Sequence, residues 1–185
     1  MPNRKERERF ERLMLRHLDA AYNLALWLMR EPAEAEDVVQ TAYLRAFEHF
    51  ASFTGGNAAG WILTIVRNTA YNSLNKRKRS SNLISFDEVV HSLQPDHALT
   101  AACPGPEAIL QAAGDRQRLM DTLQRLPVEF REAIYLREIE GYSYKEIADI
   151  TQVPKGTVMS RLARARGQLQ TLLTEQQQRT QSRVV

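Results

Sequence analysis

Arginines and small side chains recur near the C-terminus at a spacing that suits contact with a nucleic acid duplex. The stretch is 143–168, SYKEIADITQVPKGTVMSRLARARGQ. At 100° per residue, Val158 and Leu162 fall on one side of a helix that begins near Lys155, and small residues fall on the other side. The helix also carries three arginines, which are Arg161, Arg164 and Arg166. Because a small, basic helix face can approach a phosphate backbone, we predict DNA binding here; the alternative is an ordinary helical hairpin with a solvated basic face.

A second cluster, between residues 52 and 79, has the kinds of side chain that bind single-stranded nucleic acid. A glycine-rich stretch, SFTGGNAAG, precedes a helical pattern that carries an arginine, two amides and a tyrosine and that ends in KRKR. These side chains are Arg67, Asn68, Tyr71 and Asn72. Aromatic rings stack on bases while cations neutralise the backbone. The competing explanation of the same residues is a solvated basic helix end.

The helices that must position these residues are marked by caps and breaks. Ser143 and Glu146 have the spacing of a capping box, so a short helix is predicted from Tyr144. Pro154 separates it from the next helix, which makes a helix-turn-helix suited to the major groove. Further amphipathic helices are predicted over 4–29, from residue 32, over 59–76 and over 128–140. Strand signals are scarce, so the predicted fold class is all-α.

Charge and length divide the chain into two small helical domains. The 185 residues carry 25 basic and 22 acidic side chains, but 80–114 contains four acids and no lysine or arginine. This segment has three prolines and no long helical period, so we predict a flexible acidic linker. The predicted domains are 1–79 and 115–174, and the second contains the helix-turn-helix. The polar tail, 175–185, is expected to fray.

Several classes of function are disfavoured by the residues present. Cys103 is the only cysteine, which excludes an intrachain disulfide and a cysteine-rich zinc site, and we assign it no role. The four histidines show no metal-ligand spacing and no nucleophile has an evident base, so we expect neither a cofactor nor enzymatic activity. No apolar run is long enough for membrane insertion and the charged start does not resemble a signal peptide, which predicts a cytoplasmic protein.

Three blocks of the sequence resemble the extracytoplasmic-function (ECF) sigma factors, the smallest of the sigma-70-type bacterial initiation factors. The blocks are AEAEDVVQTAYLRAF at 33–47, GWILTIVRNTAYNSLNKRKR at 60–79 and LPVEFREAIYLREIEGYSYKEIADITQVPKGTVMSRLARARGQL at 126–169. Their order and the acidic gap between them make the match specific, whereas a helix-turn-helix alone occurs in many regulators. The resemblance implies a protein that binds core RNA polymerase and directs it to promoters, and a separate anti-sigma factor that holds it inactive.

The resemblance also assigns residues to three surfaces. Those expected to dock on core polymerase are Glu36, Asp37, Gln40 and Leu44. Those expected to capture flipped, non-template bases of the minus-ten element are Phe53, Asn57, Trp61, Arg67, Asn68, Tyr71, Asn72 and Lys76. Those expected to bind the minus-thirty-five element as duplex are Thr157, Met159, Ser160, Arg161, Ala163, Arg164 and Arg166, with Arg161 and Arg166 nearer the phosphates.

Some positions depart from the family's pattern. Met159 stands where lysine or arginine is common, which removes a bidentate contact to guanine, and Asn72 stands where aspartate is common. The promoter sequence is therefore not predicted. The alternative function is a free-standing helix-turn-helix regulator that binds an operator as a dimer, although the N-terminal half shows neither a clear dimerisation surface nor a sensing domain.

Overall fold

An interrupted helix opens the chain. The computed structural model describes residues 4–81 and 119–181. Helices α1 (Arg4–Met14) and α2 (Leu18–Met29) are joined by a short 3-10 turn, η1 (Leu15–His17), so the single helix predicted over 4–29 is broken. At the break, the Tyr43 hydroxyl donates to the Met14 carbonyl at 3.1 Å, which gives that oxygen a partner from another helix.

Two longer helices, α3 (Pro32–Glu48) and α4 (Ala58–Ser81), complete the N-terminal lobe, by which we mean residues 4–81. Pro32 occupies the first turn of α3 as predicted, where its missing N–H leaves no bond unmade. Helices α2, α3 and α4 pack on one another around side chains such as Leu24 and Ile62, neither of which is exposed. The turn η2 (Phe50–Ser52) contributes to an aromatic cluster that consists of Phe10, Phe47, Phe50, Phe53 and Trp61.

The C-terminal lobe, residues 119–181, begins with helical residues 119–124 and then α6 (Val128–Ile134). The helix predicted over 128–140 ends in a wider, π-helical turn, η3 (Tyr135–Ile139), in which the Tyr135 hydroxyl donates to Glu140 at 2.5 Å. Helices α7 (Tyr144–Thr151) and α8 (Lys155–Gln181) follow. Helix α8 continues past the point where we expected fraying, because the sequence there is rich in glutamine and other good helix formers.

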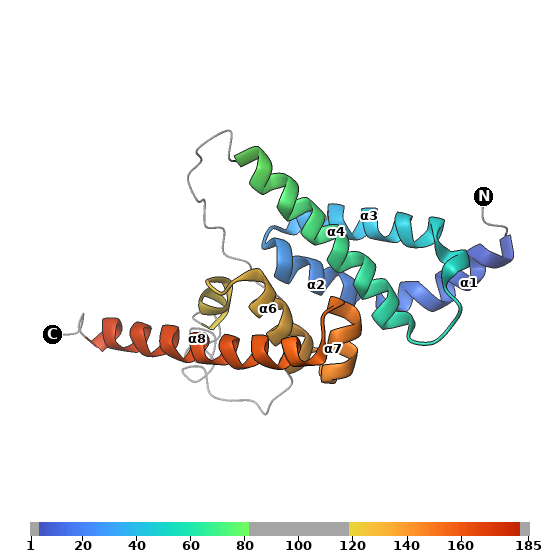
Figure 1. The fold of residues 1–185 in the computed structure, drawn as a ribbon. Helices are drawn as coiled ribbons and strands as arrows, with labels where there is room; N and C mark the ends of the chain where they lie inside the picture. The colour runs from blue at the N-terminus through green and yellow to red at the C-terminus, as the bar shows by residue number, and fades with distance from the viewer. Residues whose placement is uncertain (1–3, 82–118, 182–185) are drawn as a thin grey trace, which may run out of the picture.

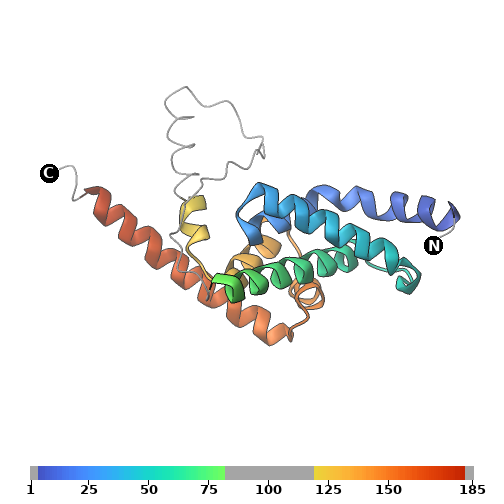
Figure 2. The ribbon, with the colours of Figure 1, turned by 90° about the horizontal axis from the view of Figure 1, so that it is seen from above.

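The two lobes lie against each other. Helix α4 packs on α7 and α2 packs on α6. In Figure 1, α6 lies between the N-terminal lobe and α8, and α7 lies at the N-terminal end of α8, next to α4. The C-terminal end of α8 projects beyond the other described helices, as the second view in Figure 2 also shows. Of the predicted linker, residues 80–81 end α4, and 82–114, which includes Cys103, lies outside the described residues.

All regular secondary structure in 4–81 and 119–181 is helical, which confirms the predicted all-α class. In the same residues, no helix has the length and apolarity needed to cross a membrane. Nor do they contain a group of three or more side chains placed to hold a metal ion.

Candidate nucleic-acid interfaces

The helix-turn-helix forms at the local signals that predicted it. The Ser143 hydroxyl accepts from the Glu146 backbone N–H at 3.3 Å, and the Glu146 carboxylate accepts from the Ser143 N–H at 2.9 Å. The bond from that backbone N–H, and then the one with the Ser143 side chain, hold the pKa of Glu146 below its ordinary value. Gln152 ends α7 in a left-handed conformation with φ of 54°, and α8 starts directly after Pro154.

One side of α8 is buried and the other is open, as its periodicity predicts. The buried side packs in the C-terminal lobe through Val158, Leu162 and Ala165. The open side carries Met159, which is 51% exposed, together with Ser160, Ala163 and Arg164. These four residues were predicted to contact duplex DNA. Three of the four side chains are small or unbranched, so the helix can lie close to base edges in a major groove.

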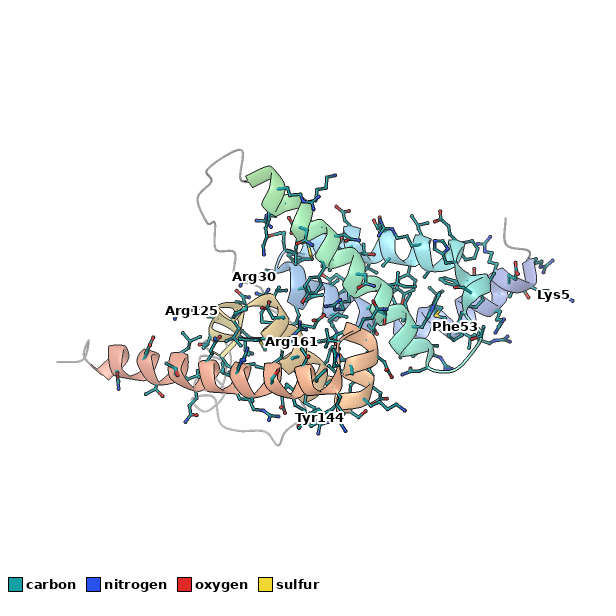
Figure 3. The ribbon with its side chains drawn as sticks, viewed as in Figure 1. Lys5, Arg30, Phe53, Arg125, Tyr144 and Arg161 are labelled. Atoms are coloured by element: carbon teal, nitrogen blue, oxygen red, sulfur yellow. The ribbon has the colours of Figure 1, made fainter. Side chains whose placement is uncertain are left out.

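The other residues predicted for the duplex are more constrained. Thr157 is half-buried, and Arg166 donates to Glu138 at 2.6 Å in an exposed ion pair. Arg161 is half-buried and lies on the side of α8 that faces the N-terminal lobe (Figure 3). Its charge acts there on Tyr71 and Glu132. In this arrangement Arg161 lies at the contact between the lobes, and its position beside the phosphates of a duplex stays a prediction.

The loop before α4 is held by a cap and by two glycines. The Asn57 side chain accepts from the Gly60 N–H at 3.0 Å, so it caps the helix. A methyl group on Gly60 would lie 3.0 Å from the Asn57 amide nitrogen, which means that glycine leaves room for this cap. Gly55 and Gly56 have φ values of 103° and 94°, which favour glycine. Asn57, predicted to contact the minus-ten element, thus has a structural role in the loop.

Phe53 does not present its ring to solvent in this structure, and its contact with a flipped base stays a prediction. Its side chain is 6% exposed, and its ring centroid lies 5.9 Å from that of Phe50 and 5.2 Å from that of Trp61. Trp61 is itself half-buried. Aromatic rings at these separations attract one another and bury a large apolar area, which outweighs exposure of an isolated ring. Phe53 therefore anchors the loop by packing its ring against Phe50 and Trp61.

The predicted base-capturing face of α4 is partly covered by α6. Arg67 Nε donates to Glu132 Oε1 at 2.7 Å, and the Tyr71 hydroxyl donates to Glu132 Oε2 at 3.0 Å. The Arg67 guanidinium also lies 4.3 Å from the centroid of the Tyr71 ring and donates to Asn68 Oδ1 at 3.1 Å. The Glu132 side chain is 1% exposed and the Arg67 side chain 13%. Farther along α4, Asn72 and Lys76 are exposed.

Burial governs the protonation of the groups in this contact. Loss of solvent raises the pKa of Glu132, and the charge of Arg67 opposes that shift. Burial, followed by the neighbouring Glu132 charge, raises the pKa of Tyr71, so its hydroxyl remains a donor. On α6, burial and the charge of Arg30 lower the pKa of Arg131 to about 10.

The C-terminal side of this contact was missed by the sequence analysis. Arg131 and Glu132 are buried on α6, and the Arg131 guanidinium donates to the Leu28 carbonyl of the other lobe at 3.4 Å. Tyr135 lies against Trp27 with the ring centroids 5.4 Å apart. A signal was present, because two charged residues interrupt the apolar side of α6 and buried charges require partners. The sequence alone does not identify the partners of these two charged side chains.

The polymerase-docking residues predicted on α3 share one accessible face. Glu36, Asp37 and Gln40 are exposed, and Leu44 is 66% exposed. The opposite face of α3 is buried, as the helical period predicts, through Ala35, Val38, Val39, Ala42 and Ala46. The free chain therefore leaves these four side chains available to a partner.

Comparison with known proteins divides the chain in the same way. The sequence family described as sigma-70 region 2 matches residues 13–80, and the one described as sigma-70, region 4 matches residues 116–169. The RNA polymerase sigma-H factor of Pseudomonas aeruginosa is 34% identical over 88% of this chain and 85% of its own length. The ECF RNA polymerase sigma-E factor of Escherichia coli is 36% identical over 72% of this chain and 70% of its own length. Among solved structures, the sigma factor RpoE in complex with the anti-sigma factor NepR from Bartonella quintana is similar with a TM-score of 0.74 and 30% identity, over 90% of this chain and 98% of that chain.

Proposed function

Because the chain belongs to the ECF sigma factors of the sigma-70 family, which are transcription initiation factors and not enzymes, we propose a division of promoter recognition among its three surfaces. The exposed face of α3 docks on core RNA polymerase. Helix α4 and the loop before it bind the non-template strand of the minus-ten element, and α8 binds the minus-thirty-five element as duplex. The observation that carries this proposal is the presence of both matched regions, in this order, on one chain whose second region contains a helix-turn-helix.

Support for duplex binding comes from the shape and charge of α8. Its outer face has few bulky groups, Arg164 is exposed on it, and residues 155–168 of the helix include no acidic side chain. Arginine is the side chain that most often makes paired hydrogen bonds to guanine, and an arginine fork also fits phosphate. In this assignment Arg164 is the residue of α8 with the largest share of the specificity.

Support for strand capture comes from the side chains that α4 gathers. A tyrosine ring, an arginine, two amides and a basic helix end lie along one helix, beside a loop that contains two glycines with positive φ. Extruding a base from a duplex costs about a few kcal/mol, so a surface that binds the extruded strand also favours opening. Asn72, Lys76 and the rest of the basic helix end are exposed in the free chain.

A separate anti-sigma factor is proposed as a regulatory partner, since the similar RpoE was solved in complex with one. Because core polymerase and chromosomal DNA are the proposed partners of this chain, we propose that the chain acts in the cytoplasm.

The test is size-exclusion chromatography of the full chain mixed with core RNA polymerase that lacks any sigma factor, followed by transcription from candidate promoters. Co-elution at one-to-one stoichiometry, with transcription that depends on the added chain, is the expected result. A chain that runs alone as a dimer and shifts duplex DNA would contradict the proposal and favour the operator-binding regulator.

A further inference from the structure

Two side chains of α4 converge on one carboxylate of the other lobe. The Arg67 N–H and the Tyr71 O–H each donate to a different oxygen of Glu132, at 2.7 Å and 3.0 Å. The arginine stacks on the tyrosine ring, 4.3 Å from its centroid, so the two donors belong to one pre-formed unit. An N–H and an O–H that point at neighbouring oxygens of a single anion make up an anion-binding site.

The chemistry of this site suits a second ligand. A phosphodiester, like a carboxylate, carries one negative charge on two terminal oxygens, and arginine pairs with either group through charge-assisted hydrogen bonds. Phosphate oxygens receive half or more of the hydrogen bonds between proteins and DNA. Both donors lie on the helix proposed to bind the non-template strand, so the anion site and the DNA surface are the same place.

Stability of the fold alone does not account for Glu132. Desolvation of a buried ion pair offsets most of its attraction, so an apolar residue at this position would hold α6 in place as well. The carboxylate is buried among cations: Arg67 bonds to it, and the charge of Arg161 on α8 acts on it. Its specific effect is to neutralise the cationic face of α4 and to tie that face to the C-terminal lobe.

We propose that the free chain masks its own minus-ten surface, with Glu132 occupying an Arg67–Tyr71 site that accepts a backbone phosphate of the non-template strand once the lobes separate. This inference rests on the proposed function. Lobe closure and strand binding then compete for the same two donors. The outer face of α8 and the docking face of α3 are exposed in the closed arrangement, so polymerase can engage the closed chain first.

The variant Glu132→Ala tests this proposal in the full-length chain. Without the carboxylate, the Arg67 guanidinium would be held between the lobes without a counter-charge, so the open form is favoured. We expect a larger radius of gyration in small-angle X-ray scattering. We also expect binding of a fluorescent thymidine oligonucleotide to tighten by about tenfold or more, because a charge-assisted competitor has been removed.

Two comparisons identify the phosphate as the ligand. The gain should disappear with an oligonucleotide of the same length that has a neutral methylphosphonate backbone, and it should disappear in the double variant Glu132→Ala, Arg67→Ala. The matched control is Asp149→Ala, which removes the charge of an exposed acid from the same lobe and should change neither the scattering nor the affinity. Equal affinity of wild type and Glu132→Ala, or a gain that persists with the neutral backbone, would overturn the proposal.

A second variant tests the proposal if Glu132→Ala does not fold. Glu132→Gln keeps the side-chain volume and removes the charge, and circular dichroism shows whether its helix content is retained. A smaller gain in oligonucleotide affinity is expected, and no gain in a folded Glu132→Gln chain contradicts the masking.

These assays need no polymerase, so the two proposals fail separately. A chain that binds polymerase but shows no gain in either variant refutes the masking alone. A chain that opens and gains affinity but never binds polymerase refutes the proposed function alone.

Discussion

The two surfaces proposed to bind promoter DNA differ in how the free chain presents them. On α8, Met159 is 51% exposed and Arg164 is also exposed, whereas on α4 the Arg67 side chain is only 13% exposed. Both surfaces lie on amphipathic helices with basic residues, so periodicity does not distinguish them. The difference lies in the donors. On the outer face of α8, the Ser160 hydroxyl donates only to the Thr157 carbonyl of its own helix, at 3.0 Å, whereas Arg67 and Tyr71 together bind a buried carboxylate of the other lobe.

The docking surface on α3 is exposed in the free chain, like the outer face of α8. Asp37 is exposed, and Leu44 is more exposed than Met159. The contact between the lobes therefore covers Arg67 and Tyr71 of the surface whose ligand exists only after the duplex has opened, and it also takes in Arg161 of α8. The following changes test this contrast between the open and the covered surfaces, beginning with the largest expected effect.

Arg164→Ala alters the open surface alone. Loss of a base or phosphate contact of this kind costs roughly 1–3 kcal/mol, so transcription from promoters that depend on the minus-thirty-five element should fall by about fivefold or more. The radius of gyration of the free chain should not change. Run-off transcription on promoters with and without that element measures the effect. Equal loss on both promoters would indicate damage to folding instead of a lost contact.

Asp37→Lys tests whether the closed chain already presents its docking face. Reversal of an exposed interface charge should weaken binding to core polymerase by about fivefold, or roughly 1 kcal/mol, and should leave lobe closure intact. Fluorescence anisotropy with labelled chain measures the affinity. Glu48→Lys, at the exposed end of the same helix, is the matched control and should bind normally. Unchanged affinity of Asp37→Lys would remove this residue from the docking face.

Trp27→Leu weakens the contact between the two lobes at a position away from Arg67, Tyr71 and Glu132. It removes the ring contact with Tyr135 across the lobes, worth about 1 kcal/mol, so the open fraction should rise by roughly fivefold. Scattering and oligonucleotide binding measure the change. Trp61→Leu alters a ring within the N-terminal lobe and should not change the scattering. Closure that is insensitive to Trp27→Leu would mean that this ring contact adds nothing to the closed state.

Ser143→Ala perturbs the open surface from within its own lobe. Loss of the cap should destabilise the C-terminal lobe by roughly 0.5–1 kcal/mol, because the Glu146 N–H loses its partner. Denaturant unfolding measures the difference. Ser143→Gly, which costs only about a few tenths of a kcal/mol at such positions, is the comparison. A loss as large in the glycine variant would point to a role of Ser143 outside the cap.

Glu146→Gln has the smallest expected effect and depends on pH. Glutamine can replace glutamate in a capping box, so stability at neutral pH should change little. In the wild type, the lowered pKa of Glu146 contributes stability that is present above its ordinary value of 4.5 and is lost as the pH falls through the lowered value. The contribution of the Glu146 charge to the unfolding free energy of the wild type, measured relative to Glu146→Gln, should therefore shrink as the pH falls below 4.5. A constant difference would exclude this linkage.

Several features of the fold were predictable because they depend on neighbours in sequence. The capping box at Ser143 and Glu146, the helix start at Pro32 and the turn before α8 all formed where the local pattern indicated. The open and buried sides of α8 and α3 follow the helical period in the same way. The break after Met14 was not predictable, since it involves a hydroxyl from Tyr43.

The features of the candidate site fall into the same two groups, those set by neighbours in sequence and those set by tertiary packing. The residue types suited to nucleic acid, their assignment to helices and the exposed positions of Asp37 and Arg164 follow from local composition and spacing, whereas the polymerase-docking role was implied by the resemblance to sigma factors. The burial of Phe53, the inward position of Arg161 and the pairing of Arg67 with Glu132 were decided by tertiary structure alone. Arg67 and Glu132 are 65 residues apart in the chain, and no helical period relates them. A residue's period predicts which side of its own helix it occupies, but only the packing of the lobes determines what covers that side.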